Sequence, residues 1–157
     1  MITRRLLPSL ALLVGVLAAC MNERVDAASL AHGITEVVSH REEREVALAS
    51  IVTSDWTQVG VFGPYTRLEA LKRCIGGRSG SRLTRGIDSR DDVTLLVFTF
   101  PDGSHESVAV ARAIAIFGPE ASGNLYTKPQ ARFSVGRTPT GRRGYLMPAS
   151  GISKRCS

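Results

Sequence analysis

The sequence has few of the residues that build metal sites, and it has no long apolar run. Its three cysteines and three histidines form no Cys-x-x-Cys or His-x-x-x-His pair, and it contains no Gly-x-Ser-x-Gly elbow. No apolar stretch reaches the about 20 residues that a membrane-spanning helix needs, and no internal repeat is apparent. These absences exclude multi-span membrane proteins and repeat arrays. We therefore expect no metal, no cofactor and no enzymatic activity, although a fold can bring distant residues together.

Aromatic residues are scarce and lysine is rarer still. Aromatics make up 6% of the 157 residues, and only three of the 20 basic residues are lysine. The length allows one domain, since domains usually have about 100–150 residues. With 14 acidic residues the net charge is +6, which is compatible with nucleic acid, anionic lipid, lipopolysaccharide or peptidoglycan as a partner. The simpler explanation of the arginine excess is codon bias in a GC-rich genome.

The amino-terminal residues have the pattern of an export signal. Arg4 and Arg5 precede an apolar run over residues 6–18, which is short for a membrane anchor and typical of a signal peptide. The run ends in Leu17-Ala18-Ala19-Cys20, which resembles the lipobox of bacterial lipoproteins. This resemblance implies removal of residues 1–19 and acylation of Cys20. The alternative is an ordinary signal peptide with a cysteine by chance near its cleavage site.

The lipobox resemblance implies a location and a domain plan. Met21 replaces the Asp that the family associates with inner-membrane retention, so an outer-membrane lipoprotein that faces the periplasm is expected. Residues 20–33 are then expected to be a tether, and residues 34–157 a single domain. Partners would be the lipid bilayer, through the acyl chains on Cys20 (palmitate among them), and envelope proteins or peptidoglycan. Nucleic acid is excluded because an exported chain does not meet the chromosome.

Two cysteines remain once Cys20 is assigned to lipid. Cys74 and Cys156 form an even pair, which in an oxidising compartment indicates one disulfide. Such a bridge would close a long loop and would fix a carboxyl-terminal tail that has few apolar residues of its own.

The sequence pattern predicts a helix and several strands. Residues 34–52 fit a helix or a strand, with helix favoured. Residues 56–62 are rich in β-formers and precede Gly63-Pro64, which predicts a strand. Thr66 and Glu69 have capping-box spacing ahead of a helix over about 67–75.

The carboxyl-terminal half is dominated by strand patterns. Residues 93–100 and 106–117 flank a turn at 101–104, which predicts a hairpin whose first arm lies centrally in the sheet. Residues 77–92 and 118–131 are expected to be loops, 132–135 a strand and 145–147 a short edge strand. Together these elements predict an α+β fold with an antiparallel sheet of about four strands and one or two helices.

One segment resembles the opening of SPOR domains. Residues 56–65, Trp-Thr-Gln-Val-Gly-Val-Phe-Gly-Pro-Tyr, are followed by a helix that contains Ala70 and Leu71. SPOR domains are βαββαβ folds that bind peptidoglycan glycan strands, so this resemblance implies glycan binding. The sequence departs from that family because it shows no second helix between the later strands. The simpler interpretation is that Trp56 and its neighbours belong to the core.

A basic loop near the carboxyl terminus is the other candidate binding region. Arginines interleaved with aromatic residues can hold acidic groups or stack on sugars. The candidate ligand-binding residues are Arg137, Arg142, Arg143, Tyr145, Trp56 and Tyr65. The alternative is a solvated loop.

The leading functional hypothesis is a non-enzymatic structural or assembly component of the cell envelope, and a SPOR-type glycan-binding module is the alternative.

Overall fold

The computed structural model describes residues 24–40, 44–76, 87–138, 140–141, 143–149, 151–152 and 154–156. The expected signal segment, Cys20 and most of the expected 77–92 loop lie outside these residues. The helices are α1 (Ala27–Ser39), α2 (Leu48–Ile51) and α3 (Leu68–Ile75), with short 3₁₀ turns η1 (Ile87–Ser89) and η2 (Lys128–Gln130). The strands are β1 (Glu45–Ala47), β2 (Gln58–Phe62), β3 (Val93–Thr99), β4 (His105–Ala111), β5 (Ile116–Phe117), β6 (Asn124–Thr127), β7 (Arg132–Arg137), β8 (Arg143–Pro148) and β9 (Lys154–Arg155).

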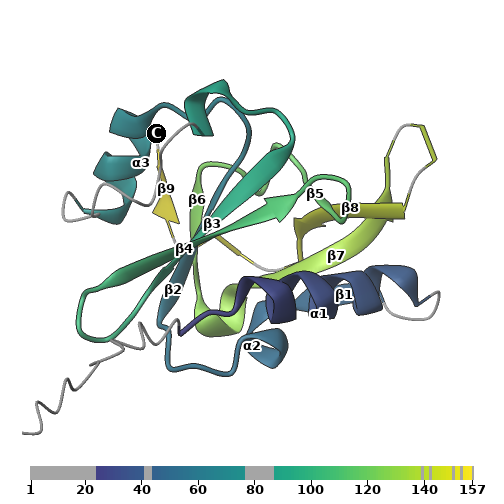
Figure 1. Cartoon of the computed structure of the whole chain (residues 1–157), viewed down its shortest axis with the longest axis horizontal. Coiled ribbons are helices and arrows are strands. Elements are labelled where there is room, and N and C mark those ends of the chain that lie inside the picture. Colours follow the sequence, from purple (N-terminus) through teal and green to yellow (C-terminus); the bar gives the residue numbers. More distant parts are fainter. Residues whose placement is uncertain are drawn as a thin grey trace, which may run out of the picture.

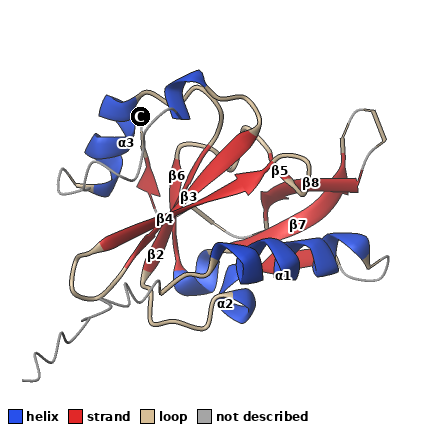
Figure 2. Ribbon diagram, in the orientation of Figure 1, coloured by secondary structure: helices blue, strands red, loops and turns tan. Residues whose placement is uncertain are grey.

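The strands form two sheets (Figures 1 and 2). One has the order β1-β7-β8-β5 and the other the order β4-β3-β2-β6-β9. All pairs are antiparallel except β5 with β8. The α+β prediction is confirmed, but a four-strand sheet accounts for only part of the structure.

The larger core lies between the two sheets and α1. Trp56 packs edge to face against Phe98 with ring centroids 5.3 Å apart, and Phe133 packs in the same way against Phe117 and Tyr126 at 5.1 and 5.2 Å. Because such pairs add about 0.5–1.5 kcal/mol to the energy of burial, the few aromatic residues are concentrated where they stabilise most.

A smaller core lies under α3, which Figure 1 shows at the opposite side of the molecule from α1 and α2. Leu71, Cys74 and Ile75 of α3 are buried against β2 and β3. The predicted disulfide between Cys74 and Cys156 is present and joins α3 to the residue after β9, with the two Cα atoms 5.1 Å apart.

The expectation that residues 20–33 form a tether is wrong for residues 24–33, the part of this segment that the structure describes. The chain is packed from Val25, which is 2% exposed, and α1 begins at Ala27. Asp26 caps the helix by accepting hydrogen bonds from the backbone N–H groups of Ala28 and Ser29. Leu30, Ile34 and Val38 follow one another at intervals of four residues, and this spacing buries one face of the helix.

Residues 34–52 combine both structures that the sequence allowed. The end of α1 is followed by β1, which pairs with β7, and then by the single turn of α2. Val46 and Leu48 are both fully buried, so the alternating pattern belongs to β1 and the start of α2.

The strand and helix around Gly63 are confirmed, but the capping box is wrong. Arg67 occupies the N-cap position without a side-chain hydrogen bond, and the Thr66 hydroxyl donates to the Gly63 carbonyl instead. The hydroxyl therefore stabilises the turn that enters α3. Glu69 still lies in the first turn of the helix, where its charge favours the helix dipole.

The hairpin is confirmed, and β3 is buried on both faces between β4 and β2. Its second arm is shorter than expected, because a turn over residues 112–115 redirects the chain to β5 in the other sheet.

The expected loop over 118–131 contains β6, whose Asn124, Leu125 and Tyr126 are buried. The expected edge strand at 145–147 belongs to β8, which lies between β7 and β5.

Candidate functional site

The basic loop lies between β7 and β8. Arg137 ends β7 and Arg143 begins β8, and the register pairs these two residues across a bulge at Gly136 and Arg137. Arg142 lies outside the described residues.

Local hydrogen bonds hold the exposed side of this loop. The Arg137 guanidinium donates to the Gly141 carbonyl at 2.9 Å, and the Gly141 N–H donates to the Thr138 carbonyl at 2.8 Å. Gly141 has a φ of 83°, which glycine adopts without strain. The guanidinium is thus positioned by the loop rather than directed into the core.

Tyr145 is half-buried and belongs to a different cluster. Burial is the main cause that raises its pKa, and the neighbouring Glu120 carboxylate, which is hydrogen-bonded to it, raises the pKa further. A Cβ atom at Gly118 would lie 2.6 Å from Glu120 Oε2 and 2.7 Å from Tyr145 Oη, so both side-chain ends lie against this glycine. The structure therefore brings Tyr145 to Glu120.

Trp56 lies in the core. It is 1% exposed, and its indole N–H donates to the Val52 carbonyl at 3.0 Å. The Lys128 ammonium lies 5.3 Å from its ring centroid and also donates to the Ser54 carbonyl. All of these partners are within the domain, so the core interpretation of Trp56 accounts for its position.

Tyr65 has the opposite character. It is 61% exposed and has a φ of 58°, a left-handed conformation that is uncommon outside glycine. Its backbone N–H donates to the Arg90 carbonyl at 3.4 Å, which links the turn before α3 to the segment before β3. Its ring is available at the surface for a flat ligand.

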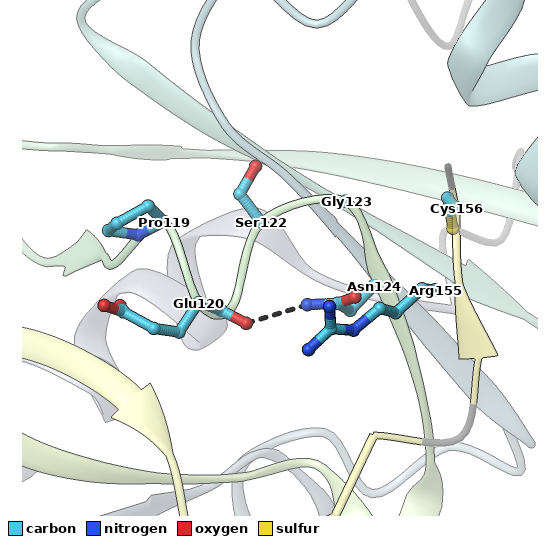
Figure 3. A pocket seen from close by; sticks show the side chains of 7 residues that line it. All are labelled: Pro119, Glu120, Ser122, Gly123, Asn124, Arg155 and Cys156. Carbon is cyan, nitrogen blue, oxygen red and sulfur yellow. Dashed lines mark hydrogen bonds between the residues drawn. The ribbon is translucent and has the colours of Figure 1, made fainter.

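A shallow depression that the sequence did not indicate lies between the β5–β6 loop and β9 (Figure 3). Its volume is about 260 Å³. Asn124 and Arg155 are paired across β6 and β9, and the Asn124 amide donates to the Glu120 carbonyl at 2.7 Å. The lining residues are Pro119, Glu120, Ser122, Gly123, Asn124, Arg155 and Cys156.

A second depression of about 90 Å³ shares Arg155 and Cys156 with the first. Arg73, Lys154 and Arg155 give it a positive charge. The disulfide therefore lies at the boundary of the two depressions. No sequence signal could have found either one, because β9 has only two residues and its pairing with β6 depends on the fold.

The acidic residues near β3 serve the structure. Arg90 forms two hydrogen bonds with the Asp92 carboxylate, at 2.8 and 2.6 Å, and lowers the pKa of Asp92. Within the described ranges no group of three or more His, Cys, Asp or Glu side chains is arranged to hold a metal ion. None of the described helices is long and apolar enough to cross a membrane.

Comparison with protein-family models, with curated proteins and with solved structures found no match for this chain.

Proposed function

We propose that this chain is an exported lipoprotein, anchored in the bacterial outer membrane through acylated Cys20, whose domain is a non-enzymatic structural or assembly component of the envelope. The observation that carries the proposal is the Cys74–Cys156 disulfide. Disulfides persist in oxidising compartments and are rare in the cytosol. The bridge therefore fits the compartment to which Leu17-Ala18-Ala19-Cys20 would deliver the domain.

The ionised side chains support a structural role. Asp26 caps α1 and Asp92 pairs with Arg90, while Asp102 pairs with Arg24. Hydrogen bonds from these partners lower the pKa of each carboxyl group. Each of these carboxylates stabilises a loop or a helix end, which is a structural role.

Acylation of Cys20 gives a direct expected result. Metabolic labelling with radioactive palmitate should label the wild-type chain and leave Cys20→Ala unlabelled, because the variant lacks the thiol that accepts the diacylglycerol. Asn22→Ala is the matched control, since it changes a residue next to the acylation site, keeps the Cys20 thiol and the disulfide, and should retain the label. Label that persists in Cys20→Ala would contradict the lipoprotein proposal.

Peptidoglycan binding is the second candidate function. It is favoured by the exposed ring of Tyr65 and by the paired positions of Arg137 and Arg143. The topology lends the SPOR resemblance no support: α3 joins β2 and β3, which pair antiparallel, and the described chain between β4 and β6 contains no α-helix. Glycan binding is therefore argued from these surface residues alone.

One comparison separates the two functions. Tagged protein is cross-linked in intact cells, and the membrane fraction and purified sacculi are then analysed in parallel. Recovery of discrete cross-linked protein partners supports the assembly role, while co-sedimentation with sacculi stripped of protein supports glycan binding.

The basic loop provides the mutational test of glycan or anion binding. If the loop binds such a partner, Arg137/Arg142/Arg143→Ala should weaken binding by about tenfold or more, because exposed cation contacts contribute about 0.5–1 kcal/mol each. Sedimentation with sacculi at moderate salt measures the change. Arg67/Lys72/Arg73→Ala removes equal charge from α3 and its N-cap and is the matched control. Unchanged binding in the loop variant, or equal loss in both, would show that the loop is merely solvated.

A further inference from the structure

The first described residues are fastened to the tip of the β3–β4 hairpin. The Glu106 carboxylate accepts the backbone N–H groups of Arg24 and Val25, at 3.1 and 3.2 Å. The Arg24 guanidinium donates to Asp102 at 3.0 Å and lies 4.3 Å from the centroid of the Phe100 ring. We call this set of five residues the N-terminal clamp.

The clamp is continuous with the core. Val25 and Phe100 are each 2% exposed, so both ends of the clamp are anchored by burial. Asp102 also accepts hydrogen bonds from the backbone and hydroxyl of Ser104, which fixes the turn. With Asp26 capping α1 directly afterwards, the chain has no free segment between Arg24 and the helix.

The distance from the clamp to Cys20 is short. Only residues 21–23 separate Cys20 from Arg24. Four Cα-to-Cα steps span at most about 14 Å when fully extended. A domain of about 130 residues has a radius of gyration near 14 Å and is therefore roughly 35 Å across. Because the tether is shorter than the domain is wide, the domain cannot rotate so that its opposite end contacts the membrane.

The two ends of the molecule also differ in charge. Figure 1 shows the β3–β4 turn and the ends of β7 and β8 that carry Arg137 and Arg143 at opposite ends of the long axis. The clamp and the adjoining helix start contain the carboxylates of Asp26, Asp102 and Glu106 and the guanidinium of Arg24. If the domain could rotate freely on the membrane, the end that carries Arg137 and Arg143 would be attracted to anionic lipid headgroups.

We propose that the N-terminal clamp seats the domain on the phospholipid headgroup surface with the β3–β4 turn toward the lipid, and that it presents the Arg137–Arg143 end away from the membrane. The inference rests on the proposed acylation of Cys20. The lipid-facing surface is the turn over residues 101–104 with the first turn of α1. The clamp thereby keeps the basic loop available to partners in the periplasm.

Distance-dependent quenching tests this orientation. The full-length gene carries Ala27→Cys or Thr140→Cys, each at an exposed position, the first directly after the clamp and the second in the β7–β8 loop, and the acylated protein is labelled with a fluorophore. It is reconstituted into phosphatidylcholine–phosphatidylglycerol vesicles that contain a lipid with a nitroxide headgroup. The label at residue 27 should be quenched several-fold more than the label at residue 140.

Two further variants test the cause of the orientation. Insertion of twelve Gly and Ser residues after Asn22 should raise quenching at residue 140, because the basic end then reaches the headgroups. Asp102→Ala/Glu106→Ala should act in the same direction by releasing Arg24 and Val25. Insertion of the same linker after Ser81, between α3 and η1, leaves both the clamp and the labelled β7–β8 loop unchanged and is the control.

The outcomes separate this proposal from the lipoprotein proposal. Mass spectrometry of the purified chain reports acyl groups on Cys20 and the integrity of the Cys74–Cys156 bridge. A chain without acyl groups overturns both proposals. An acylated chain with equal quenching at residues 27 and 140, or with no response to the linker after Asn22, overturns the orientation alone.

Discussion

Removal of the Cys74–Cys156 disulfide is expected to lower the free energy of unfolding by about 4 kcal/mol, because the bridge closes a long loop and restricts the unfolded chain. The two cysteines are 82 residues apart. Urea unfolding of Cys74→Ala/Cys156→Ala, followed by circular dichroism and compared with the oxidised wild type, measures the loss. A total stability of about 5–15 kcal/mol is usual for a domain, so the variant should be close to unfolding at growth temperature.

The same change should release β9 before the rest of the fold. β9 has two residues, both exposed, and the Cys156 N–H donates to the Gly123 carbonyl at 2.8 Å. Hydrogen exchange at residues 154–156 should become fast, while exchange in β3 should remain slower than at these residues because it requires unfolding of the whole domain. Chemically reduced wild-type protein is the matched control because it keeps both side chains. Equal stability of the oxidised and reduced proteins would contradict the prediction.

Elements with strong local patterns could be predicted from the sequence. β2 and β3 consist mainly of β-branched and aromatic residues, and their burial follows from that composition. α3 has an apolar face and a glycine stop at Gly76, so its limits were close to correct. The disulfide followed from cysteine counting, because only one pairing remained once Cys20 was assigned to lipid.

Elements that depend on distant partners could not be predicted in this way. β6 is a four-residue segment, and it is a strand because β2 lies beside it. α1 begins with Ala, Ser and His residues that show little hydrophobic periodicity, and its start depends on the Asp26 cap and on burial of Leu30. The hydrogen bonds of the N-terminal clamp join residues 78–82 positions apart.

The sequence indicated which residues could belong to the candidate site but not how they are arranged in space. The sequence indicated arginines beside aromatic residues, but the pairing of Arg137 with Arg143 depends on a bulge in the register of β7 and β8. The contact between Tyr145 and Glu120 likewise joins residues that are distant in the sequence. Whether an aromatic residue lies in the core or at the surface is a property of the tertiary structure, as Trp56 and Tyr65 show.

Replacement of Trp56 by alanine is expected to lower the free energy of unfolding by about 3–5 kcal/mol, the usual cost of truncating a buried aromatic residue. The indole packs on Phe98 and donates to the Val52 carbonyl, so the variant would leave both a cavity and an unpaired acceptor. Trp56→Phe should cost less, because it keeps a ring and loses the N–H. Since Trp56 is the single tryptophan, unfolding of both variants in urea must be followed by circular dichroism.

Tyr65→Ala is the matched control and separates a core role from a binding role. Tyr65 is 61% exposed, so its truncation should change stability by no more than about 0.5 kcal/mol, as for most surface substitutions. If the chain binds glycan strands, Tyr65→Ala should weaken sedimentation with sacculi, because the exposed ring is lost as a stacking surface. Trp56→Phe is expected to fold and to bind as the wild type does. The side chain at this position is buried: Trp56 is 1% exposed and contacts Phe98 and Lys128, so a ligand would not reach it. Loss of binding in Trp56→Phe at unchanged stability would instead make Trp56 a ligand contact.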